Sequence, residues 1–215
     1  MLKVLFILAP ILAVVLMGAA VTFAGELPRT RPTMDFGWRF LLGDPPSAQL
    51  ADFDDSAWRP VDLPHDWSIF GPFDETAPAR GGGAYLPTGV GWYRKTFQIP
   101  DAFQNRQVRI EFDGVYENSD VWINGHWLGK RPFGYISFSY DLAAYLKFNQ
   151  QPNVLAVRVD NSVQPNSRWY SGSGIYRHTW LSVTDPLSIA PGGVYAITPQ
   201  VSETNATVQI ATQVV

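Results

Sequence analysis

Short runs of alternating apolar and polar side chains cover most of the chain after its first thirty residues. The runs 92–99, 107–112 and 153–160 place apolar residues on one face, as in half-buried strands. Two further apolar runs flank Asn124-Gly125, the dipeptide that supplies both positive-φ positions of a type I′ hairpin turn. Turn signals recur roughly every ten residues, a spacing typical of sandwiches and barrels. The pattern predicts an all-β fold, a jelly-roll β-sandwich.

The folded part is predicted to begin at Met34 and to end near Asp185. Residues 34–40 are expected to form an edge strand, and Asp141 is expected to cap one or two helical turns at 141–146. Residues 186–215 contain two more strand-like pieces, which are too few to form a stable domain. We therefore expect residues 186–215 to be the start of a second β domain.

The N-terminal 24 residues differ from the rest of the chain. Lys3 is their only charge, an apolar run extends from Val4 to Val21, and small residues surround Ala24. This arrangement predicts a signal peptide over residues 1–24, followed by a linker at 25–33, and export to the periplasm or the outside of a bacterial cell. The alternative is an uncleaved membrane anchor, because the apolar run is nearly long enough to span a bilayer.

Composition narrows the function classes. The net charge is -3, which gives no electrostatic reason to expect nucleic-acid binding. Cysteine is absent, so disulfides are excluded. Aromatic residues make up 14% of the chain. They serve either as a core of large side chains or, in part, as stacking surfaces for sugar rings.

No catalytic or metal-binding set is evident in the sequence. The three histidines are scattered without ligand spacing, and no cofactor motif is present. Paired carboxylates are the groups that a sugar-cleaving enzyme would need. The candidates lie in turns or at strand ends, where solvated or capping roles are the default: Asp52, Asp54, Asp55, Glu111, Asp113, Glu117 and Asp120.

The connection 161–180 is the strongest candidate for a binding loop. It is long and rich in Gly, Ser, Asn and Pro, yet it carries several aromatic rings and two arginines. Long ordered loops on a β scaffold commonly carry binding residues.

Five segments occur in an order and spacing that resemble one family. They are Leu63-Pro64-His65-Asp66-Trp67, Gly91-Trp92-Tyr93-Arg94-Lys95-Thr96-Phe97, Phe112-Asp113-Gly114-Val115, Val121-Trp122-Ile123-Asn124-Gly125 and Ser173-Gly174-Ile175-Tyr176-Arg177. They look like the N-terminal sugar-binding domain of glycoside hydrolase family 2. The sequence around Arg168-Trp169-Tyr170-Ser171-Gly172 looks most like the bacterial β-galactosidase branch of that family.

The resemblance implies a galactose-binding-domain-like jelly roll, then an immunoglobulin-like sandwich, then a (β/α)8 barrel. In such enzymes the barrel carries an acid/base glutamate and a nucleophilic glutamate, and hydrolysis retains the anomeric configuration. Neither glutamate is expected within these 215 residues. The resemblance thus implies a chain shortened before its barrel, which alone would not hydrolyse glycosides.

In such enzymes the loop before Ser-Gly-Ile-Tyr-Arg contributes to the sugar subsite of the barrel. The substrate-binding residues implied here are Arg168, Trp169, Tyr170 and Ser171. Some relatives carry an acidic residue near the position of Arg168, so the contact made there is expected to differ. Ser173 to Arg177 are instead predicted to hold the loop to its own domain.

Three functional hypotheses remain open at this point. The chain is an accessory domain of a glycosidase, whose partners are a β-galactoside or related glycoside and a downstream barrel. Alternatively it is a free-standing carbohydrate-binding module, or a purely structural docking domain. Galactoside, glucuronide and mannoside substrates are not distinguished.

Overall fold

A computed structural model describes residues 29–215 of the chain. The predicted signal peptide, 1–24, and the start of the predicted linker lie outside the described residues. Among residues 29–215, no helix is both long enough and apolar enough to cross a membrane. The questions of export and of an N-terminal anchor therefore stay predictions.

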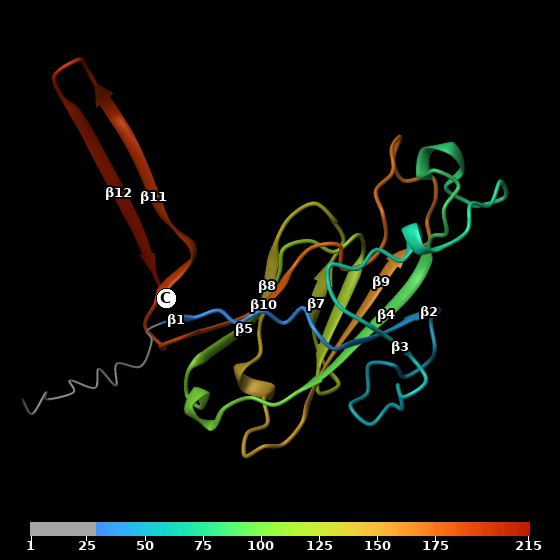
Figure 1. The fold of residues 1–215 in the computed structure, drawn as a ribbon. Helices are drawn as coiled ribbons and strands as arrows, with labels where there is room; N and C mark the ends of the chain where they lie inside the picture. Colours follow the sequence, from blue (N-terminus) through green and yellow to red (C-terminus); the bar gives the residue numbers. More distant parts are fainter. Residues whose placement is uncertain (1–28) are drawn as a thin grey trace, which may run out of the picture.

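Two antiparallel sheets pack face to face and form the predicted jelly-roll sandwich (Figure 1). The six-stranded sheet has the order β3-β2-β4-β9-β6-β7. Its strands are β2 (Trp38–Leu42), β3 (Arg59–Val61), β4 (Gly89–Phe97), β6 (Ser119–Ile123), β7 (His126–Arg131) and β9 (Asn153–Asn161). The four-stranded sheet has the order β1-β10-β5-β8. Its strands are β1 (Arg29–Thr30), β5 (Gln107–Phe112), β8 (Phe138–Asp141) and β10 (Thr179–Thr184).

The main core lies between the two sheets. The apolar face of each strand points inward, and the largest fully buried apolar side chains include Trp38, Tyr93, Phe112 and Leu155. In β5 the burial alternates residue by residue, as the sequence predicted. Only four short 3-10 helices accompany the strands among residues 29–215: η1 (Ser68–Phe70), η2 (Arg80–Gly83), η3 (Asp101–Phe103) and η4 (Ala143–Tyr145).

The predicted hairpin turn is confirmed, and the predicted helix cap is not. Asn124 and Gly125 have φ angles of 50° and 83°, and they join β6 to β7 as the predicted hairpin. Asp141, the last residue of β8, accepts a hydrogen bond from the Ala143 amide at 2.8 Å. It is not the predicted N-cap, however, because Leu142 holds that position before a single 3-10 turn, where one or two helical turns were expected.

Two predictions about the N-terminal part differ from the structure. The strand expected at 34–40 begins only at Trp38, and it is an inner strand, because β3 pairs with its outer side. Within the predicted linker, Arg29 and Thr30 pair with β10. A two-residue strand carries no alternation that a sequence pattern could reveal.

A second apolar cluster covers the outer face of the six-stranded sheet. Ala48 and Trp58 of the segment 43–58 are buried there together with Trp92 of β4 and Ala156 of β9. The side chain of Arg94 is nearly fully buried and binds this segment through carbonyl oxygens and through Asp55. One buried cation thus fixes a segment that has no strand of its own.

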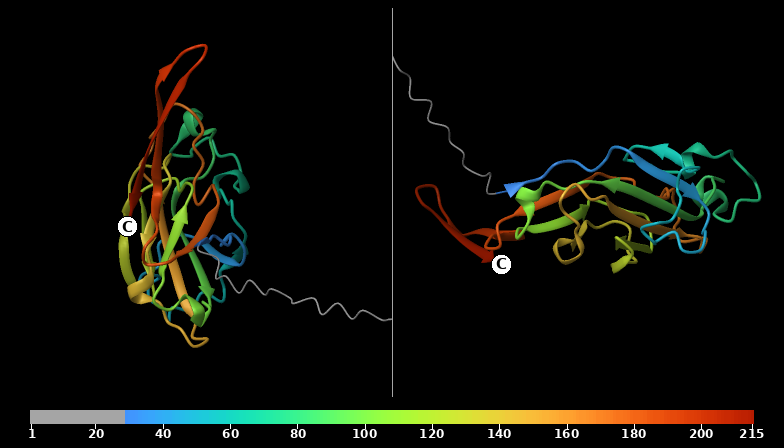
Figure 2. Two further views of the ribbon diagram at one scale, coloured as in Figure 1. Left: turned by 90° about the vertical axis from the view of Figure 1, so that its left-hand side faces the viewer. Right: turned by 90° about the horizontal axis from the view of Figure 1, so that it is seen from below.

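The strands β11 (Ile189–Val201) and β12 (Ala206–Val214) form a separate hairpin. It projects from the end of the sandwich that carries β1, opposite the loops around residues 71–88 (Figures 1 and 2). Its apolar side chains, such as Val194, Tyr195 and Ile210, are largely exposed. The two strands agree with the strand-like pieces expected there, and the assignment to an immunoglobulin-like domain stays a prediction.

Candidate functional site

The loop 162–178 connects β9 to β10 at the end of the sandwich away from the β11–β12 hairpin (Figure 1). Asn161, the last residue of β9, holds its two ends together. The Asn161 amide donates hydrogen bonds to the Gly172 carbonyl at 3.0 Å and to the Ser173 hydroxyl at 2.8 Å. Its oxygen accepts hydrogen bonds from Gln164 and Asn166. The buried side-chain amide of Asn161 therefore holds the loop closed.

Residues 172–175, which we call the clip, attach the loop to its own domain. The Gly174 backbone exchanges two hydrogen bonds with Tyr116, at 2.8 and 2.9 Å. On the other side, the amide of His65 donates to the Ile175 carbonyl and that of Trp67 to the Ser173 carbonyl. The clip thus lies like a short strand between two segments, which is the holding role predicted for Ser173 and its successors.

Asp66 is the main anchor of the clip. Its Oδ1 accepts the backbone N–H groups of Ser68 at 2.9 Å and Ser173 at 2.8 Å. Its Oδ2 accepts the hydroxyl proton of Tyr170. Burial and the Asp66 carboxylate together raise the pKa of Tyr170 far above its ordinary value. Tyr170 is therefore a neutral donor that fixes the loop from its own side.

His65 lies buried beneath the clip, between the rings of Phe40 and Phe70, with its Nδ1 2.8 Å from Tyr93 Oη. Burial, and secondarily the charge of Arg59, lowers the pKa of His65 from 6.5 to about 4. A buried neutral histidine stabilises the fold above its unfolded-state pKa. This contribution disappears as the pH falls, because the unfolded state binds the proton first.

We therefore expect His65 to make the domain sensitive to mild acid. The contribution of His65 to the free energy of unfolding should fall by on the order of 3 kcal/mol between about pH 7 and about pH 4. Urea unfolding at several pH values checks this by comparing wild type with His65→Phe, which should show a shallower loss toward acid. His126→Phe, which removes an exposed histidine, is the control. Equal slopes for His65→Phe and wild type would refute the prediction.

An open cleft of about 410 Å³ lies beside the loop. Three segments line it: the turn that follows β5, the β7–β8 connection, and the loop itself. The lining residues are Tyr116, Glu117, Phe133, Tyr135, Asn166, Ser167, Arg168 and Trp169. A volume of this size is typical of small-molecule sites. The aromatic rings and convergent polar groups suit a polyhydroxylated ligand.

The four sequence-predicted site residues fall into two pairs. Arg168 and Trp169 line the cleft, and the Arg168 guanidinium makes no hydrogen bond or ion pair with any residue that the structure describes. Tyr170 and Ser171 are not among the residues that line the cleft; together with Trp169 they line a much smaller neighbouring cavity of about 20 Å³. Ser171 bonds to the Tyr135 and Ser167 hydroxyls. The structure therefore puts Arg168 and Trp169 at the cleft and gives Tyr170 and Ser171 supporting contacts.

Sequence reasoning missed the residues that complete the cleft from other loops. Phe133 and Tyr135 belong to the β7–β8 connection, where two aromatic residues flank Gly134 in an otherwise turn-like segment. Glu117 was one of seven carboxylates given a solvated or capping role. Its partner Asn166, at 3.2 Å, belongs to the loop. Aromatic residues beside a glycine in a turn were the available signal.

Tyr176 and Trp180, which also belong to the connection 161–180, have structural contacts. The Tyr176 hydroxyl donates to the Gly134 carbonyl at 2.8 Å. The Trp180 indole donates to Asp113 at 3.0 Å, and the Arg31 guanidinium lies 4.3 Å from its ring centroid. Within residues 29–215, no group of three or more metal-ligating side chains is placed to hold an ion.

Comparison with known proteins gives a consistent answer. Residues 83–186 match the family model for the sugar binding domain of glycosyl hydrolases family 2. The chain is 54% identical over 199 residues to Beta-galactosidase BoGH2A of Bacteroides ovatus, covering 93% of this chain and 23% of that protein. It is 32% identical over 160 residues to a Beta-glucuronidase of Bacteroides fragilis, covering 70% of this chain and 22% of that protein.

Solved structures agree with these relatives. A beta-glycosidase from Bacteroides vulgatus superposes with a TM-score of 0.82 at 44% identity, covering 86% of this chain and 24% of that chain. A Bacteroides uniformis beta-glucuronidase gives a TM-score of 0.75 at 32% identity, covering 85% and 22%. The chain spans about a quarter of the length of each of these relatives. It belongs to glycoside hydrolase family 2 and carries the N-terminal sugar-binding domain of that family.

Proposed function

We propose that this chain is the sugar-binding domain of a β-galactosidase-like glycoside hydrolase and that its loop 162–178 forms part of the sugar subsite. The observation that carries the proposal is the 54% identity, over nearly the whole chain, with a protein named as a beta-galactosidase. The cleft beside the loop supports it, because Arg168 and Trp169 both line that cleft.

In this role the domain binds and orients the sugar, and it does not break the glycosidic bond. The Arg168 guanidinium carries five donors in a planar fork, which suits bidentate hydrogen bonds to neighbouring hydroxyls or to a carboxylate. The exposed Trp169 ring offers an apolar surface for a pyranose face. Cleavage with retention needs two carboxylates about 5 Å apart, which the family resemblance assigns to a barrel.

Replacement of Arg168 in the complete enzyme tests the subsite role. Arg168→Ala should lower kcat/KM for a β-galactoside about tenfold or more, because charge-assisted hydrogen bonds contribute roughly 1.5–3 kcal/mol. The melting temperature should stay near that of wild type, since the side chain has no hydrogen bond among the described residues.

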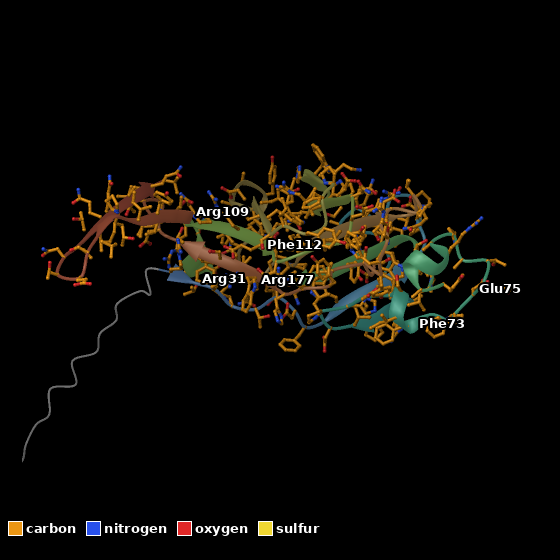
Figure 3. The ribbon with its side chains drawn as sticks, turned by 90° about the horizontal axis from the view of Figure 1, so that it is seen from above. Arg31, Phe73, Glu75, Arg109, Phe112 and Arg177 are labelled. Atoms are coloured by element: carbon orange, nitrogen blue, oxygen red, sulfur yellow. The ribbon has the colours of Figure 1, made fainter. Side chains whose placement is uncertain are left out.

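Arg109→Ala is the matched control for this replacement. Arg109 lies on β5 toward the β1 end of the sandwich, and Phe73 marks the opposite end (Figure 3). This variant should leave the rate unchanged. If Arg168→Ala hydrolysed β-galactosides at the wild-type rate, the subsite role would be refuted.

A second substrate class belongs in the same assay, because some relatives are named as beta-glucuronidases. Arg168 is the only cationic residue among those that line the cleft, so it is the group that a uronic acid carboxylate would contact. Parallel assays on aryl β-galactosides and aryl β-glucuronides decide between the two. Higher kcat/KM on the glucuronide, with loss of that activity in Arg168→Ala, would favour this second class.

We also propose that the protein is exported, with residues 1–24 removed as a signal peptide. The single charge before an apolar run is the supporting observation. Cell fractionation and N-terminal sequencing of the mature protein test this proposal. A protein recovered from the membrane with Met1 intact would support an anchor instead.

A further inference from the structure

We infer that Glu117, Tyr135 and Phe133 complete the cleft as a recognition site for an uncharged pyranoside and that Glu117 selects against anionic sugars. This inference rests on the proposed function, since it names the sugar class that the same site takes. It goes beyond that function by assigning the selecting group to a segment outside the loop 162–178.

Glu117 is held in place and still has unused acceptor capacity. Its Oε1 accepts a hydrogen bond from the Asn166 amide at 3.2 Å. Asn166 is bonded in turn to Asn161, so Glu117 is connected to the end of β9. Among residues 29–215, the second carboxylate oxygen has no hydrogen-bond partner. A carboxylate with free lone pairs can accept protons from two neighbouring sugar hydroxyls, which is a strong and directional contact.

The aromatic side of the cleft is rigid before any ligand arrives. The Tyr135 ring centroid lies 5.2 Å from that of Tyr116 and 5.6 Å from that of Phe133, both in tilted or edge-on geometry. The Trp169 indole donates to the Tyr135 hydroxyl at 3.3 Å, and that hydroxyl donates to Ser171 at 3.2 Å.

These contacts leave a large part of each outer ring uncovered. Phe133 is 55% exposed, Tyr135 45% and Trp169 61%. Aromatic rings with free faces beside a polar group suit the C–H face of a pyranose. Because the ring contacts and the hydrogen bonds of Tyr135 and Trp169 already hold the rings, little side-chain entropy is lost when a sugar binds.

The charges around Glu117 favour a neutral ligand. No lysine or arginine forms an ion pair with Glu117 among the described residues, and Asp160 is the like charge beside it. The Asp160 amide donates to the Glu117 carbonyl at 3.0 Å, so the two residues are held together. The Asp160 carboxylate is paired with Arg158 at 3.2 Å.

The other titratable groups that line the cleft are Arg168, Tyr116 and Tyr135. The tyrosines are neutral hydroxyls, and Arg168 is solvent-exposed, so solvent screens its charge. A uronate bound against Glu117 would bring two like charges together with only this screened cation to offset them. A hydroxymethyl group in the same place carries no such penalty.

The test measures binding of two matched sugars to the chain. Methyl β-galactopyranoside and methyl β-glucopyranosiduronate are titrated separately, followed by calorimetry and ligand-observed NMR. Wild type should bind the galactoside and prefer it over the uronate. Glu117→Gln should weaken galactoside binding about tenfold, as expected for loss of a charge-assisted hydrogen bond, and should reduce the preference.

Glutamine keeps the shape of the side chain and the hydrogen bond from Asn166, so the melting temperature of Glu117→Gln should equal that of wild type. Glu203→Gln makes the same change of charge in the distant turn between β11 and β12, and it should leave both affinities unchanged. Equal binding of the two sugars, no binding of either, or unchanged binding by Glu117→Gln would overturn the inference.

The proposed function fails separately, in a hydrolysis assay on the complete enzyme. Suppose that galactoside binding depends on Glu117 but that the complete enzyme cleaves no β-galactoside. This result would refute the proposed function and would leave the inferred recognition site standing. If the enzyme cleaves β-galactosides but Glu117→Gln binds the galactoside as wild type does, the inferred role of Glu117 would be refuted and the proposed function would stand.

Discussion

Arg94→Met is expected to lower the free energy of unfolding by about 3–5 kcal/mol, as when one partner of a buried ion pair is removed. The side chain is almost completely buried, and its Nε bonds to Asp55 at 2.8 Å. Its terminal nitrogens donate to the carbonyls of Ala48 at 2.5 Å, Leu50 at 2.9 Å and Phe53 at 3.3 Å. Methionine fills most of the space but leaves these acceptors without a donor.

Urea unfolding at neutral pH measures this loss, with Arg31→Met as the matched control. Arg31 also pairs with a carboxylate, Glu111 at 2.8 Å, but its side chain is 43% exposed. Exposed pairs contribute about 0–1 kcal/mol, so the control should lose little stability. A similar small loss for both variants would contradict the prediction and would mean that the segment 43–58 repacks without Arg94.

The parts of the fold that the sequence predicted are those with local causes. The alternation in 107–112 reports directly which face of β5 is buried, and Asn124-Gly125 specifies a hairpin turn by its own backbone preferences. Neither inference needs to know the strand's partner. The jelly-roll prediction succeeded because many such local signals recur at the spacing of a sandwich.

Pairing between distant segments was not predictable in the same way. Arg29 and Thr30 form a strand only because β10, near the other end of the sandwich sequence, offers a free edge. Trp38 to Leu42 is an inner strand because Arg59 to Val61, which contains a proline, pairs with it. Side-chain patterns within each segment do not record these partners.

The residues of the site also divide into those with local sequence signals and those that only the fold brings together. Arg168 and Trp169 were predicted because they lie in one unusual loop. Glu117 and Tyr135 come from two other segments, and only the fold brings them to that loop. Tyr170 is an aromatic residue next to Trp169 in the sequence, yet its hydroxyl bonds to Asp66 and it does not line the cleft. The different contacts of these two neighbouring residues depend on the fold, and the sequence pattern of the loop does not record them.

Gly174→Ala is expected to lower the free energy of unfolding by about 3–5 kcal/mol, through backbone strain and steric overlap together. Gly174 has a φ of +119°, a conformation that L side chains rarely adopt. A Cβ there would lie 2.2 Å from the Tyr93 hydroxyl and 2.7 Å from the His65 carbonyl. The backbone on that side cannot move without breaking the hydrogen bonds that hold the clip.

Gly89→Ala separates the two causes. Gly89 has a nearly equal φ of +114°, but a methyl group added there would have no atom within 4 Å. This variant therefore carries the strain alone, roughly 1–3 kcal/mol. Urea unfolding gives the difference between the variants, and hydrogen exchange of the Gly174 amide, which bonds to Tyr116, shows whether the clip has opened. Equal losses for the two variants would mean that the clip adapts to a side chain. A larger loss with rapid exchange at residue 174 would mean that the clip is rigid, so that the cleft keeps its shape without a ligand.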